Sequence, residues 1–128
     1  MTAADKKIIL EHGSDYVLRM KIMADDGINN RDMSAWTWAF EVYNNLGVKQ
    51  DPYKVTGTFD STTETVNGDV TIVIDSAHIN TIPPAVTGDD AFATQYNYYY
   101  TLTVTEPGAT SDVRRDMRLL RGRLSVRL

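Results

Sequence analysis

The stretch that most constrains the fold of this chain runs from Asp32 to Tyr43. Side chains in a strand alternate between its two faces, so in this stretch the large apolar residues all point one way and the small or polar residues point the other. The apolar set is Trp36, Trp38, Phe40 and Val42. It contains both tryptophans of the chain, and two such side chains bury enough area to dominate the packing of a small domain. We therefore predict a half-buried strand at the centre of the core.

The same alternation recurs in the segments before and after this strand. Apolar residues alternate from Tyr16 to Ile22 and again from Val70 to Ile74. Gly13 permits a bend or turn ahead of the first of these segments. The dipeptide Asn67-Gly68 predicts a type I′ hairpin turn, because both residues tolerate the positive φ that such a turn requires.

A tyrosine-rich strand follows a long loop. Asp75-Ser76 is expected to cap one turn of helix, which Pro83-Pro84 stops. Residues 86–95 have no period and are expected to form an exposed loop that contains Asp89 and Asp90. Alternation in the next strand places Tyr96, Tyr98 and Tyr100 on one face and Tyr99 on the other. Tyrosines at period-two spacing usually fill a sandwich interior, so we expect the first three to lie in the core rather than to form a stacking platform.

The C-terminal segment, residues 113–128, alternates apolar and basic residues. Leu120 and Leu124 are expected to point into the core, opposite Arg121 and Arg123. Seven or so short strands with turn signals every eight to twelve residues, and almost no helix, predict an all-β fold, an antiparallel β-sandwich. Residues 1–128 are expected to form one domain, with 1–7 as a flexible N-terminal tail.

The charge of the chain is unevenly distributed. The net charge is −4, yet six of the thirteen basic residues lie in the last fifteen positions. These six are Arg114, Arg115, Arg118, Arg121, Arg123 and Arg127. A molecule with unlike faces suits contact with copies of itself or with other subunits, and we expect these arginines and the loop of Asp89 and Asp90 to make such contacts. An acidic chain makes nucleic-acid binding a weaker expectation.

Nothing in the sequence predicts catalysis, a metal or a cofactor. The chain has no cysteine, and its two histidines, His12 and His78, lie in unrelated segments. The acidic residues Asp25, Asp26 and Asp32 do not have the spacing of an EF-hand loop and are interpreted as solvated turn residues. No segment has the length or apolarity of a signal peptide or a membrane span, so we expect a protein without membrane contact.

The order of the motifs resembles a known family. A first segment, Leu10-Glu11-His12-Gly13-Ser14-Asp15-Tyr16, leads to Asp32-Met33-Ser34-Ala35-Trp36-Thr37-Trp38, then to Asp75-Ser76 and the Tyr-x-Tyr strand. The chain closes with Arg118-Leu119-Leu120-Arg121-Gly122-Arg123-Leu124-Ser125-Val126. This pattern is similar to the small immunoglobulin-like β-sandwich domains of tailed-bacteriophage virion proteins, including the N-terminal domains of baseplate upper proteins. Residues 83–95 form a longer connection than is usual in such domains.

The resemblance implies an immunoglobulin-like sandwich of about seven to nine strands with one short helical turn. It also implies a non-enzymatic structural protein, made in the cytoplasm of a host bacterium and incorporated into the virion. We expect an adaptor or accessory subunit of the tail or baseplate that contacts other virion proteins and copies of itself. The alternatives are a head decoration protein and a carbohydrate-binding module for host-surface glycans.

Overall fold

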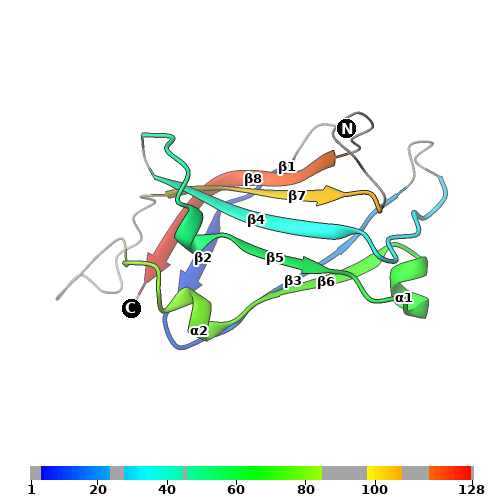
Figure 1. Cartoon of the computed structure of the whole chain (residues 1–128), viewed down its shortest axis with the longest axis horizontal. Coiled ribbons are helices and arrows are strands. Elements are labelled where there is room, and N and C mark those ends of the chain that lie inside the picture. Colours follow the sequence, from blue (N-terminus) through cyan, green and yellow to red (C-terminus); the bar gives the residue numbers. More distant parts are fainter. Residues whose placement is uncertain (1–3, 24–27, 45, 85–97, 108–115, 128) are drawn as a thin grey trace.

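The computed structural model describes residues 4–23, 28–44, 46–84, 98–107 and 116–127 (Figure 1). Within these residues eight strands form two sheets. The larger sheet contains β1 (Ala4–Asp5), β2 (Ile8–Glu11), β4 (Thr37–Asn44), β5 (Val55–Thr58), β7 (Tyr98–Thr105) and β8 (Asp116–Arg127). The smaller sheet is the antiparallel pair of β3 (Tyr16–Lys21) and β6 (Asp69–Ile74).

The order of strands in the larger sheet is β1-β8-β7-β4-β5, with β2 also paired to β8. In this order the last strand, β8, lies between the first strands and β7, and a buried tryptophan lies on β4. Both features are typical of an immunoglobulin-like sandwich. The prediction of an all-β sandwich is thus confirmed. One detail differs, because β1 and β2 both run parallel to β8, so the larger sheet is mixed rather than antiparallel.

The core lies between the two sheets and is built from the alternation seen in the sequence. Trp38, Phe40 and Val42 of β4 are buried, and Trp36 is buried just before the strand begins. The same core contains Leu102, Val104, Leu120, Leu124, Val70, Ile72 and Ile74. Tyr100 is buried and its ring stacks on Phe40 with centroids 5.2 Å apart. The residues with the strongest period-two pattern therefore form the interior.

Short helical segments occupy opposite ends of the sandwich (Figure 1). Helix α2 (Ser76–Ile79) follows Asp75, whose side chain accepts a hydrogen bond from the His78 N–H, as predicted. The structure adds α1 (Thr63–Val66) and the 3₁₀ turn η1 (Asp51–Tyr53), which the sequence analysis did not predict.

The predicted Asn67-Gly68 hairpin is wrong. Residues Thr63–Val66 form α1, and Asn67 has φ −89° and caps its end. Only Gly68 has positive φ, at +84°. A glycine in the left-handed region after a short helix is a common helix ending, so the same residue type that permits a hairpin turn terminates a helix here.

The prediction of a flexible tail over residues 1–7 is corrected for its second half. Ala4 pairs with Leu120 and Asp5 with Arg121, so β1 is an edge of the larger sheet. The Lys6 N–H then donates to the Arg121 carbonyl oxygen at 2.9 Å. These residues are held because their backbone groups complete the ladder of β8.

Candidate functional site

Strands β7 and β8 present their polar residues on the outer face of the larger sheet. Thr101 pairs with Arg121 and Tyr99 with Arg123. Cross-strand partners share a face, so Tyr99 lies with the arginines and away from the buried Tyr100. We call the exposed set Arg118, Arg121 and Arg123 the arginine face.

A β-bulge at Leu119 aligns the three arginines. Leu102 pairs with Leu120, whereas Thr103 pairs with Arg118, so one extra residue of β8 lies between these pairs. Without the extra residue, Arg118 and Arg121 would fall on opposite faces because they are three positions apart. The bulge thus places Arg118 on the outer face while Leu119 packs partly against the core.

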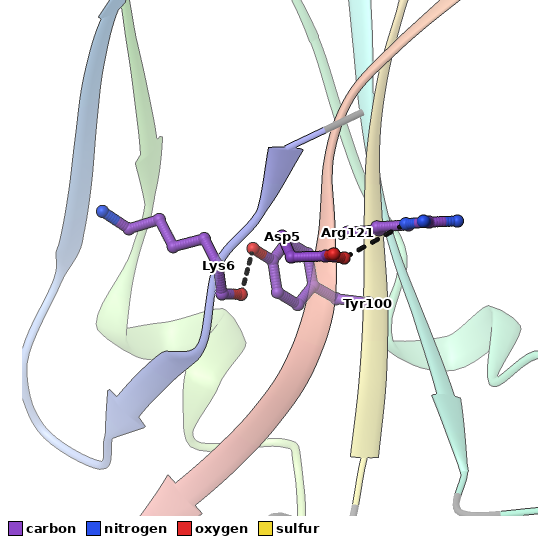
Figure 2. A network of polar contacts seen from close by, with 4 residues as sticks. All are labelled: Asp5, Lys6, Tyr100 and Arg121. Carbon is purple, nitrogen blue, oxygen red and sulfur yellow. Dashed lines mark hydrogen bonds and ion pairs between the residues drawn. The ribbon is translucent and has the colours of Figure 1, made fainter. Parts of the chain in front are cut away.

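The guanidinium groups of the arginine face have few partners within the described part of the molecule. Arg121 Nε donates to the Asp5 carboxylate at 3.1 Å, with side chains 52% and 78% exposed (Figure 2). The Arg123 Cζ lies 5.6 Å from the centre of the Tyr99 ring. Such exposed contacts contribute little stability but restrict the side chains, which lowers the entropy lost when a partner binds them.

A shallow hollow of about 370 Å³ lies beside these contacts. Its lining includes Tyr43 and Tyr99, which pair across β4 and β7, together with Arg121 and Arg123. Asp5 and Thr101 complete the polar part of the rim. Tyrosine and arginine are among the residues most enriched at the centres of protein interfaces.

Beside the hollow, β1 pairs in parallel with β8 (Figure 2). The Tyr100 hydroxyl points to Lys6, the residue that follows β1, and donates to its carbonyl oxygen at 2.7 Å. Burial raises the pKa of Tyr100, with smaller contributions from Tyr16 and Asp5. Gly122 has φ +156°, and a Cβ there would lie 2.3 Å from the same carbonyl oxygen, so only glycine lets the two strands approach this closely.

Of the other predicted contact residues, only Arg127 belongs to the described part of the chain. Arg127 lies where β8 pairs with β2, and its Nη1 is 3.7 Å from a carboxylate oxygen of Glu11. Its side chain is only 21% exposed, so it is less available to a partner. Arg114, Arg115, Asp89, Asp90 and Tyr96 lie outside the described residues.

Sequence reasoning missed Asp5 and Tyr43 as part of this site. Tyr43 ends the apolar stretch of the central strand, and alternation alone is enough to set it on the face opposite Val42. Asp5 has no such signal, because parallel pairing with a strand more than a hundred residues away leaves no local pattern.

The histidines bond the main chain. His12 Nε2 lies 2.8 Å from the Ile82 carbonyl oxygen, and His78 Nε2 lies 2.8 Å from that of Tyr53. A carbonyl oxygen can only accept, so both rings donate from Nε2. Within the described ranges, no group of three or more histidine, aspartate or glutamate side chains has a geometry that could hold a metal ion. In the same ranges no helix has the length and apolarity needed to cross a membrane.

Comparisons with known proteins add little to this geometry. No family model and no curated protein matches the chain. A solved structure from a photo-crosslinking study of multimeric cell-adhesive interactions of VGSC beta subunits is similar over 95% of this chain and 91% of that chain. The sequence identity is 13% and the TM-score 0.42, so this similarity supports no statement about what the present chain binds.

Proposed function

We propose that this protein is a non-catalytic structural subunit that binds a partner protein through the arginine face. The observation that carries the proposal is the bulge at Leu119, which turns Arg118 to the side of the sheet where Arg121 and Arg123 flank the hollow of Tyr99. Guanidinium forks bind carboxylates with two parallel hydrogen bonds, and desolvation beside an aromatic ring strengthens them. The partner surface is therefore acidic.

The sequence resemblance supports a tailed-phage virion as the setting. We propose an adaptor or accessory subunit of the tail or baseplate, made in the bacterial cytoplasm, whose partners are other virion proteins. A head decoration protein could use the same face on the capsid lattice. Electron cryomicroscopy of the intact particle distinguishes the two, because the closely spaced Trp36 and Trp38 make this chain identifiable in the density.

The tyrosine strand does not favour binding of glycans. Tyr100 is buried, so its ring cannot stack on a sugar, and the half-buried Tyr98 donates its hydroxyl to the Pro83 carbonyl oxygen at 3.0 Å. Of the described tyrosines of this strand, Tyr99 alone is exposed, and its ring is already beside Arg123. We therefore place the glycan-binding alternative behind protein assembly.

The first prediction concerns the arginine face. The double variant Arg121→Glu/Arg123→Glu should reduce incorporation into particles by about tenfold or more, because like charges would then face an acidic partner. Incorporation is measured by quantitative mass spectrometry of purified particles.

The matched control is Arg19→Glu/Lys21→Glu. It makes the same charge change on the exposed face of β3, in the other sheet. This control should be incorporated like the natural chain. Unchanged incorporation of the Arg121/Arg123 variant would refute the proposed role of the arginine face.

A further inference from the structure

Strand β5 has an open edge. It pairs with β4 on one side, and no other described strand pairs with it. Natural edge strands are usually blunted by lysine, proline or a bulge, yet the four residues of β5 are Val, Thr, Gly and Thr. The strand therefore offers unprotected main-chain donors and acceptors to a further strand.

The direction of these donors and acceptors follows from the hydrogen bonds at the end of the strand. The Phe59 N–H donates to the Trp36 carbonyl oxygen at 2.9 Å, and the Phe59 carbonyl oxygen accepts from the Ala35 N–H at 3.0 Å. The backbone of Phe59 thus faces the β4 side. Backbone groups alternate along a strand, so those of Thr56 and Thr58 point to the open edge.

The side chains alternate in the same regular way from residue 54 to residue 60. Val55, Gly57 and Phe59 face the interior, and the Gly57 Cα lies against the indole of Trp38, which leaves no room for a Cβ. The exposed residues on the other face are Lys54, Thr56, Thr58 and Asp60. Among the described residues, neither Lys54 nor Asp60 forms an ion pair within the chain.

We infer that β5 pairs antiparallel with β5 of a second copy of this chain, about a two-fold axis at Gly57. In this register Thr56 lies opposite Thr58 of the other copy, and these are the residues whose backbone groups point outward. Lys54 then lies directly opposite Asp60 of the other copy, and the two-fold axis makes this pair twice. The edge is self-complementary in both hydrogen bonding and charge.

The two neighbouring registers lack this complementarity. The outward backbone groups also permit axes at Thr56 or Thr58. An axis at Thr56 places Lys54 opposite Thr58 and Asp60 opposite Pro52, whereas an axis at Thr58 places Lys54 opposite Thr62 and Asp60 opposite Thr56. Neither forms an ion pair, so charge selects the Gly57 register. Because β5 is short, we expect a weak, concentration-dependent dimer.

The test uses charge reversal and analytical ultracentrifugation over a concentration series. Lys54→Asp and Asp60→Lys should each weaken self-association about tenfold, because two attractive pairs become repulsive. An equal mixture of the two variants should associate like the natural chain. In the mixed dimer the two substituted side chains face each other with opposite charges, and the two natural residues pair as before. The double variant Lys54→Asp/Asp60→Lys should also recover self-association.

Controls separate this interface from the arginine face and from unfolding. Lys21→Asp makes the same charge change on β3 and should leave association unchanged. Arg121→Glu/Arg123→Glu should also leave association unchanged, because these arginines are on β8 and the inferred interface, which does not depend on the proposed function, is on β5. Circular dichroism checks that each variant is folded. A natural chain that stays monomeric at every concentration, or single variants that associate normally, would overturn the β5 dimer.

A second measurement uses the absence of cysteine from the chain. Residues facing each other in a hydrogen-bonded antiparallel pair have Cα atoms about 5.5 Å apart, which lies within the range that a disulfide spans. The variant Thr56→Cys/Thr58→Cys should therefore form a covalent dimer on oxidation, whereas the exposed Thr71→Cys on β6 should not. Equal cross-linking of the two variants would also overturn the register.

Discussion

At the scale of single residues, two glycines show how the surroundings decide the cost of a side chain. Gly13 and Gly68 both have φ +84°. A Cβ on Gly13 would meet no atom within 4 Å, whereas a Cβ on Gly68 would lie 2.4 Å from the Ile22 carbonyl oxygen. The two positions therefore share a positive φ that disfavours a side chain and differ in the space around a Cβ.

We predict that Gly13→Ala lowers the free energy of unfolding by roughly 1 kcal/mol, the cost of a left-handed conformation for an L-residue. Gly68→Ala should cost at least twice as much, because the Ile22–Gly68 backbone contact at the end of α1 must shift. Urea denaturation of both variants measures the difference. Equal losses would show that the backbone at Gly68 relaxes without cost.

Tyr100 couples the stability of the fold to alkaline pH. Burial raises the pKa of Tyr100 above its ordinary value of 10.0, so above that pH the unfolded chain loses the phenol proton while the folded chain keeps it. The stabilisation from this group is complete below pH 10 and falls as pH rises toward the folded-state pKa.

Tyr100→Phe should therefore cost about 1 kcal/mol at neutral pH, through the lost hydrogen bond to Lys6, and should make the decline in stability above about pH 10 shallower. Tyr16 and Tyr98 also have raised pKa values, so some decline remains. Urea unfolding curves collected from neutral to strongly alkaline pH measure both effects. An unchanged alkaline slope would contradict the assignment to Tyr100.

At the scale of elements, helix α1 depends on its first cap. The Thr62 Oγ1 accepts from the Thr65 N–H at 3.2 Å and lies 2.9 Å from the Thr65 hydroxyl oxygen. The helix contains Thr-Glu-Thr-Val, whose two threonines and valine have low helix propensity, so side-chain capping matters more than sequence preference.

Thr62→Ala should lower the free energy of unfolding by about 1 kcal/mol, and Thr62→Ser, which keeps the hydroxyl, should recover most of it. Thermal unfolding by calorimetry measures both variants. If serine and alanine behave alike, the methyl group of Thr62 rather than its hydroxyl stabilises this turn.

The strands were predictable from sequence to the extent that their pattern is local. Alternation placed Trp38, Phe40 and Leu124 inside and Arg121 and Arg123 outside, because one buried face requires period two. The bulge at Leu119 was not predictable, since two successive leucines fit either face. Helix α1 was missed because its residues favour no helix and its terminal glycine also suits a hairpin.

At the scale of the whole molecule, the sandwich was predictable from the sequence, but the sheet that each of the first strands joins was not. Strands β2 and β3 are separated by the turn at Gly13, yet β2 belongs to the larger sheet and β3 to the smaller one. A turn signal tells where the chain changes direction but not which sheet receives the next strand. For the same reason the sequence around Asp5 gives no sign that it forms β1, and it was predicted to be a flexible tail.

The position of β8 has a consequence for biosynthesis. Strands β1 and β2 leave the ribosome before the other strands of this domain, whereas their partner β8 follows all of them, with a sequence separation of 116 between Asp5 and Arg121. Until β8 emerges, the backbone groups on one edge of β7 have no neighbouring strand and the first strands have no template. Nascent chains should therefore remain open to chaperones, proteases and aggregation until translation of the domain is nearly complete, and closing such distant contacts makes the final folding step slow.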